Sequence, residues 1–149
     1  MLRRSLPGVP VVDVDLTSVR SWDDFHDTFA RALGFPDFYG RNMAAWVDCM
    51  TRADYDEGMT GVVVEDGDIL TLHLIGAERL RARAPDLYAA MIDWAAFVNW
   101  RRIDVGERPI LAISYYEPGA GSSPGWARTA ARSIMSARRR LGHRVRRGR

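Results

Sequence analysis

The stretch Phe35–Thr51 reads FPDFYGRNMAAWVDCMT, and the predicted fold is built outward from it. Pro36 fixes one backbone dihedral angle and Gly40 can adopt conformations that other residues avoid, so the stretch should begin as a tight turn. Asn42 stands where a helix cap is expected, and a short helix should run to about Arg52. A helical wheel gives this helix an apolar side and a second stripe, which should face the core and the exterior respectively. The apolar side holds Met43, Trp46 and Met50 with Val47 at its border, and the second stripe holds Arg41, Ala44, Asp48 and Thr51.

The residues before this stretch predict one strand and one helix. Val9–Leu16 starts as a β-branched run and then alternates apolar with acidic residues, as in a strand that enters a buried sheet. Ser21 and Asp24 form a capping-box pattern, and apolar residues then recur at helical spacing until Gly34. His26 borders the apolar side of this helix, where we expect a structural role.

A hairpin is predicted after the stretch. Val62–Val64 and Ile69–Ile75 flank an Asp-Gly pair, which favours a tight reversal between two antiparallel arms. Alternation in the second arm places His73 on one face of the sheet, as a hydrogen-bonded structural imidazole.

Two helices should follow the hairpin. A short helical pattern covers residues 77–84, and a longer helix should run from Pro85 to about Arg102, because proline suits a first helical turn. Phe97 and Trp100 point away from the apolar face of the longer helix. We expect them to pack on neighbouring loops, and a partner surface is the alternative.

The last predicted element is the apolar strand Pro109–Tyr116, of a kind found in sheets with covered faces. Strands separated by helical crossovers favour a parallel sheet. The expected fold class is therefore α/β, a three- to four-stranded, mainly parallel sheet covered by helices, over residues 1–117. Residues 118–149 read as a Gly/Ser/Pro linker and an arginine-rich tail, for which we expect disorder or a transient helix.

Charge divides the chain at the same place. Residues 1–117 hold all 19 acidic residues and 12 arginines, a formal charge of −7, whereas residues 118–149 hold nine arginines and no acidic residue, a charge of +9. No apolar segment approaches membrane-spanning length, the start lacks a secretory signal pattern, and Cys49 is the only cysteine. We therefore expect a cytoplasmic protein with no membrane contact.

The sequence lacks the obvious signatures of enzymes. No phosphate-binding glycine loop, nucleophile elbow, CxxC pair or HExxH helix is present, and the three histidines show no ligand spacing with Cys49. We expect no catalytic residue, metal, cofactor or small-molecule substrate. An acidic domain with one organised polar stripe fits binding to a basic partner better than catalysis.

A resemblance to a known family is carried by the turn and the helix. The pattern is Phe38-Tyr39-Gly40-Arg41-Asn42, then Asp48-Cys49-x-Thr51, with Pro36 before it. It resembles the signature of the barstar family, small cytoplasmic inhibitors of secreted bacterial ribonucleases of the barnase type. The order of elements is also similar over about residues 9–116, whereas the tail has no counterpart. The resemblance implies the α/β fold and an immunity protein, of the toxin–antitoxin kind, that binds a basic ribonuclease.

The resemblance also implies which residues meet the partner. Asp48 matches an aspartate that enters the ribonuclease active site and occupies the place of a substrate phosphate. Phe38 matches an aromatic contact, and Gly40 and Asn42 match loop residues at the interface. Thr51 matches a position at its margin.

Three positions depart from the family pattern. Ala44 stands where a second contacting aspartate is expected, Val47 where an interface tryptophan is expected, and Arg41 replaces an acidic residue. The predicted partner-binding set is Phe38, Tyr39, Gly40, Arg41, Asn42, Ala44, Val47, Asp48 and Thr51.

The sequence thus predicts an inhibitor that occludes the active site of a basic ribonuclease. The alternative is a nucleic-acid-associated protein, in which the arginine-rich tail binds and the domain is a scaffold or dimeriser. An enzyme with an unrecognised motif is the third hypothesis.

Overall fold

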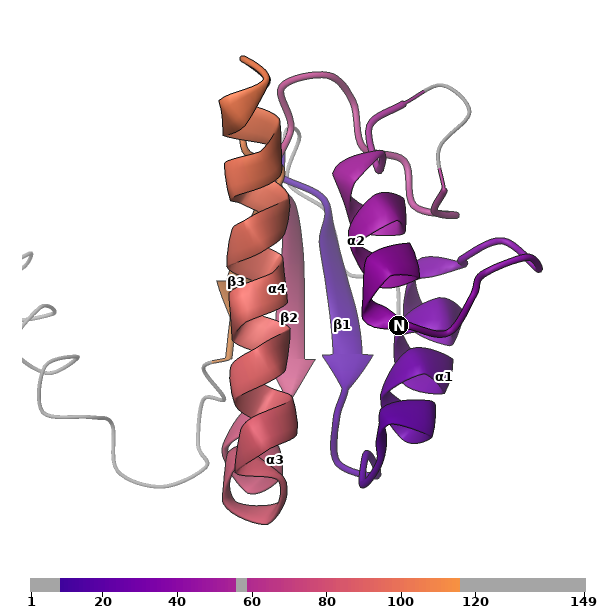
Figure 1. Ribbon diagram of the computed structural model, residues 1–149, viewed down its shortest axis with the longest axis vertical. Coiled ribbons are helices and arrows are strands. Elements are labelled where there is room, and N and C mark those ends of the chain that lie inside the picture. The colour runs from indigo at the N-terminus through magenta and orange to yellow at the C-terminus, as the bar shows by residue number, and fades with distance from the viewer. Residues whose placement is uncertain (1–8, 56–58, 116–149) are drawn as a thin grey trace, which may run out of the picture. The chain divides into compact units, whose positions relative to one another are not determined.

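The computed structural model describes residues 9–55 and 59–115, in which helices pack on a parallel sheet (Figure 1). The elements are β1 (Val11–Asp15), α1 (Trp22–Leu33), α2 (Met43–Thr51), β2 (Leu70–Ile75), α3 (Ala77–Arg83), α4 (Pro85–Asp104) and β3 (Leu111–Ser114). All three strands run parallel in the order β1-β2-β3, so β2 is the central strand. The predicted α/β class and parallel sheet are confirmed.

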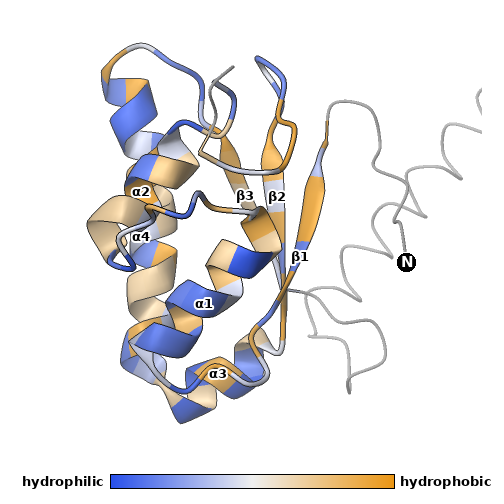
Figure 2. Cartoon of the chain, turned by 90° about the vertical axis from the view of Figure 1, so that its right-hand side faces the viewer, coloured by the Kyte–Doolittle hydropathy of each residue, from blue (hydrophilic) through white to orange (hydrophobic). Residues whose placement is uncertain are grey.

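The alternation of β2 decides which face of the sheet is covered. Its three leucines are buried in the core, and the residues between them are only half-buried. Figure 2 shows α1, α2 and α4 on one side of the sheet. On the other face, Nδ1 of His73 donates a hydrogen bond to Oδ1 of Asp13 at 2.8 Å, across a register pair of β1 and β2. The predicted structural role of His73 is confirmed.

Aromatic side chains join α1 to α2 in the core. The ring centroids of Phe25 and Phe29 lie 4.5 Å apart, and those of Phe29 and Trp46 lie 5.5 Å apart. All three side chains are fully buried, and burying each contributes about 1.5–3 kcal/mol. The predicted capping box of Ser21 and Asp24 is present and begins α1. It fixes the residue at which α1 starts, and therefore which side chains of α1 face the core. The turn-and-helix stretch is thereby held against α1.

The predicted hairpin is wrong. Residues 62–64 do not form a strand, and β2 pairs in parallel with β1 on one side and β3 on the other. A central strand has no free edge for an antiparallel arm, so the preceding segment runs as a loop. The Asp66-Gly67 pair still makes a turn, closed by a 3.0 Å hydrogen bond from the N–H of Asp68 to the carbonyl of Glu65.

The C-terminal half of the described chain follows the prediction closely, with two differences. Pro85 occupies the first turn of α4, and α4 ends two residues beyond the predicted limit. The apolar sequence of β3 predicted a strand with both faces covered. β3 is instead a short strand at the edge of the sheet, and three of its four residues are only half-buried. The difference arises because the described sheet carries its helices on one face (Figure 2).

Two predictions concern the remainder of the chain and its environment. The predicted linker and tail, residues 118–149, lie outside the described residues. Within residues 9–55 and 59–115, no helix is both long and apolar enough to cross a membrane. The same part of the chain contains no group of three His, Cys, Asp or Glu residues that could hold a metal ion.

Candidate functional site

The loop between α1 and α2 is shaped by its own hydrogen bonds and by the cap of α2. The carbonyl of Pro36 accepts from the N–H of Tyr39 at 2.9 Å, which closes the predicted turn. Asn42 is the N-cap of α2, and its side-chain oxygen accepts from the N–H three residues later at 2.9 Å. Within residues 36–42 the positive φ belongs to Arg41, at 51°, and not to Gly40 as predicted. Gly40 instead provides space, because a Cβ there would lie 3.1 Å from Nδ2 of Asn42.

Arg41 ties the loop to α1. Its guanidinium group forms ion pairs with Asp27 and, at 3.5 Å, with Asp23. All three side chains are exposed to a large extent, so each pair contributes little stability by itself. Asp23 and Asp27 therefore neutralise Arg41 and link α1 to the loop.

Tyr39 holds the loop from its inner side. Its hydroxyl lies 2.6 Å from Nδ1 of the buried His26, and its ring packs against Phe35 at a centroid distance of 4.7 Å. Burial lowers the pKa of His26, and the nearby Arg41 lowers it further. Burial also raises the pKa of Tyr39 above its ordinary value. The expected structural role of His26 is confirmed. The contacts of Tyr39 with His26 and Phe35 hold the loop against α1.

The tip of the loop is the most exposed part of the predicted surface. Phe38 is 76% exposed, although burying a phenyl ring is normally more favourable than leaving it in water. Asp37, its neighbour, is also exposed. A phenyl ring held out by a hydrogen-bonded turn is a ready contact for a protein partner.

The outer stripe of α2 carries a salt bridge to α4. Oδ1 of Asp48 lies 2.8 Å from Nη1 of Arg101, and the two side chains are 46% and 45% exposed. Ala44, one turn earlier, is exposed. Thr51 is half-buried, and its hydroxyl donates to the carbonyl of Val47 at 2.7 Å. Arg101 was outside the predicted set, because only the packing of α2 on α4 brings it to Asp48.

Val47 does not lie on this surface. Its side chain is only 2% exposed and belongs to the core, together with Trp46 and Met50. The assignment of Val47 to the partner-binding set is therefore corrected. The helical wheel placed Val47 at the border of the apolar side, and the buried zone of α2, which packs on α4, extends past that border.

A buried ion pair that the prediction missed fixes the end of α2. Arg102 is 5% exposed, and its two terminal nitrogens lie 2.8 and 2.7 Å from the carboxylate oxygens of Asp54. It also donates to the carbonyl of Thr51 at 2.7 Å. The available signal was spacing, since Arg102 follows the buried Val98 by four residues on the same face of α4.

The groups gathered here suit recognition more than acid–base chemistry. Cys49 is buried on the inner side of α2, and burial together with the charge of Asp48 raises the pKa of its thiol to about 11. The imidazole of His26 is also buried and is hydrogen-bonded to Tyr39. The exposed groups are a phenyl ring, an ion-paired carboxylate and the hydrogen-bonded backbone of a loop.

Comparison with known families agrees with this geometry. The chain matches the family described as barstar (barnase inhibitor) over residues 9–107, which include the loop, α2 and Arg101. No curated protein matches the chain. The strands β1 and β2, the capped α2 and the exposed loop before it lie inside the matched region, whereas β3 lies beyond its end. The protein belongs to the barstar family.

Proposed function

We propose that this protein inhibits a basic ribonuclease of the barnase type by covering its active site with the 36–42 loop and α2. The observation that carries the proposal is the half-exposed Asp48 on the outer stripe of α2, beside a loop that displays Phe38. A carboxylate at this place can occupy an anion subsite that a nuclease uses for substrate phosphate. The ring of Phe38 then excludes water from the rim of the contact.

Long-range charge supports the same proposal. Residues 1–117 carry a formal charge of −7, which attracts a basic nuclease and speeds its encounter with the inhibitor. A few desolvated contacts then set the lifetime of the complex. The complex of barnase with barstar is itself a standard example of both effects. The proposed mechanism involves no metal or cofactor, and the lone thiol of Cys49 suits a reducing compartment such as the cytoplasm.

The test is inhibition of RNA cleavage by barnase and by basic ribonucleases from the native host. Asp48→Ala should weaken inhibition by about 3 kcal/mol, or more than 100-fold, as for a desolvated charged hot spot. Glu78→Ala is the matched control, because it removes the same charge from an exposed site on α3 and should act only through weaker steering. Failure of every enzyme to be inhibited would refute the function. An effect of Asp48→Ala below about 1 kcal/mol would remove Asp48 from the mechanism.

The nine arginines of residues 118–149 favour one alternative, binding of nucleic acid by the tail. Deleting these residues distinguishes the two functions. The truncated protein should retain full ribonuclease inhibition if the domain is the inhibitor. Loss of a salt-sensitive nucleic-acid affinity, with no inhibition before or after truncation, would support the alternative.

A further inference from the structure

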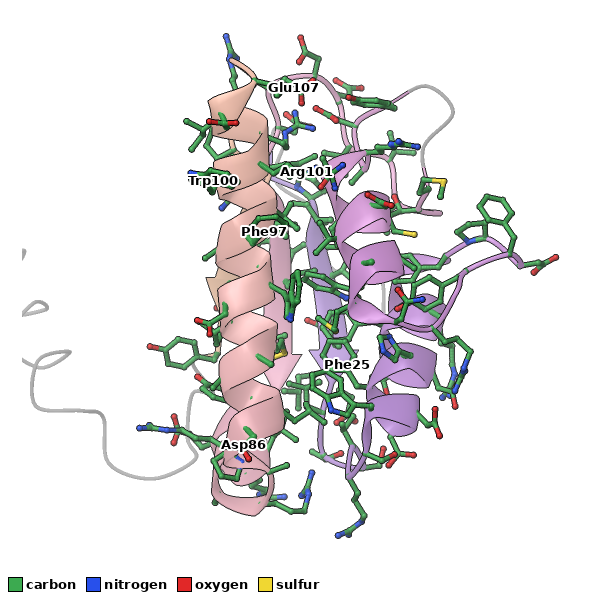
Figure 3. The ribbon with its side chains drawn as sticks, viewed as in Figure 1. Phe25, Asp86, Phe97, Trp100, Arg101 and Glu107 are labelled. Carbon is green, nitrogen blue, oxygen red and sulfur yellow. The ribbon has the colours of Figure 1, made fainter. Side chains whose placement is uncertain are left out.

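The salt bridge between Asp48 and Arg101 changes the charge that α2 presents. Figure 3 shows Arg101 on the side of α4 that faces α2. Its Nη1 atom is 2.8 Å from the carboxylate of Asp48, so the carboxylate proposed to mimic phosphate already has a cationic partner in the free protein. The second guanidinium group of the surface, on Arg41, is paired with Asp23 and Asp27. At these two places the surface therefore presents opposite charges in pairs.

Stability does not explain the pair between Asp48 and Arg101. Both side chains are nearly half exposed, and exposed ion pairs contribute little to folding. At a protein interface the same charges lose their water, and each charge must then find a complement. A cation brought close to Asp48 also comes close to Arg101, and like charges at that separation repel strongly once water is excluded.

The neighbours of Arg101 strengthen this effect. Phe97 lies one helical turn before it, and the rings of Phe97 and Trp100 stack with a centroid distance of 5.6 Å. Both rings are exposed, as Figure 3 illustrates. A partner that covers Arg101 would also cover this apolar pair, which removes water from around the charge.

We propose that Arg101 is a specificity-determining residue that disfavours ribonucleases presenting only positive charge to α2. It acts as an internal counter-ion of Asp48, so that a favoured target has a neutral or acidic group, in place of a second cation, opposite Arg101. The proposal rests on the inhibitor function and narrows the class of its target.

The test uses barnase as the probe and the full-length chain. Arg101→Met keeps an unbranched apolar stem in place of the arginine stem and removes the charge, and Arg81→Met makes the same change on the exposed surface of α3. Arg101→Met should inhibit barnase at least tenfold more tightly than the wild type, and Arg101→Glu should inhibit more tightly still. Arg81→Met should change inhibition by less than about threefold, because it alters only the long-range charge. Urea unfolding should show similar stability for all four proteins.

The results separate the two proposals. If Arg101→Met binds barnase no more tightly than Arg81→Met, or if neither inhibits, the role of Arg101 is overturned. If the wild type nevertheless inhibits another basic ribonuclease, the inhibitor function stands and only the role of Arg101 fails. If neither the wild type nor any variant inhibits any enzyme of the set, both proposals fail.

Discussion

The adjacent arginines Arg101 and Arg102 should differ sharply in their effect on stability. Arg102 is 5% exposed and forms charge-assisted hydrogen bonds to both carboxylate oxygens of Asp54, at 2.8 and 2.7 Å. It also donates through Nε to the carbonyl of Arg108 at 2.7 Å. Arg102→Met leaves the Asp54 carboxylate, itself only 9% exposed, without its counter-charge. Removing one partner of such a pair costs about 3–5 kcal/mol.

The change is measured by urea unfolding followed through tryptophan fluorescence. With a urea m-value of about 2 kcal/mol per M, the midpoint of Arg102→Met should fall by roughly 2 M. Arg101→Met is the control, because its salt bridge is exposed and contributes at most about 1 kcal/mol. The double variant Arg102→Met/Asp54→Leu should recover much of the loss, since it removes both buried charges.

Two results would refute this reasoning. The first is a loss for Arg102→Met no larger than that for Arg101→Met. The second is a double variant as unstable as the sum of the losses measured for Arg102→Met and for Asp54→Leu alone, which would mean that the two side chains act independently.

Two further predictions concern titratable side chains near α2. Burial lowers the pKa of His26 in the folded protein, so below the unfolded value of about 6.5 the unfolded chain binds more protons, and stability should fall as pH drops from 7 to 5. His26→Asn should reduce that fall in urea titrations at several pH values, and an unchanged fall would contradict the assignment. The thiol of Cys49, with its pKa raised to about 11, should react with iodoacetamide at pH 8 much more slowly in the native protein than in urea. Equal rates would contradict the burial of Cys49. The chain has one cysteine, so all the measured alkylation reports on this thiol.

Local sequence signals predicted most of the fold. The capping box at Ser21, the cap at Asn42 and the proline at the start of α4 each depend on neighbours a few residues away, and each helix begins where they indicate. The alternation of β2 likewise predicted that its side chains divide between two faces, and the structure buries the face that holds its leucines. The exposure of the stripe that holds Asp48 followed from the helical wheel.

Predictions from sequence spacing were wrong where strand pairing or burial depends on distant parts of the chain. Asp66-Gly67 makes the local turn that it predicts, yet the hairpin fails because β1 and β3 occupy both edges of β2. Val47 is buried because the core extends past the border that the wheel gave it.

By itself, the sequence determined the four helices, the three observed strands, their order and the exposed stripe that holds Asp48, because these depend on short-range periodicity and caps. Only the tertiary structure decided the charge of that stripe. Arg101 meets Asp48 from 53 residues away, and Arg41 meets Asp27 from 14 residues away. Such pairs form when packed helices place the two groups in contact, and no local pattern encodes that distance.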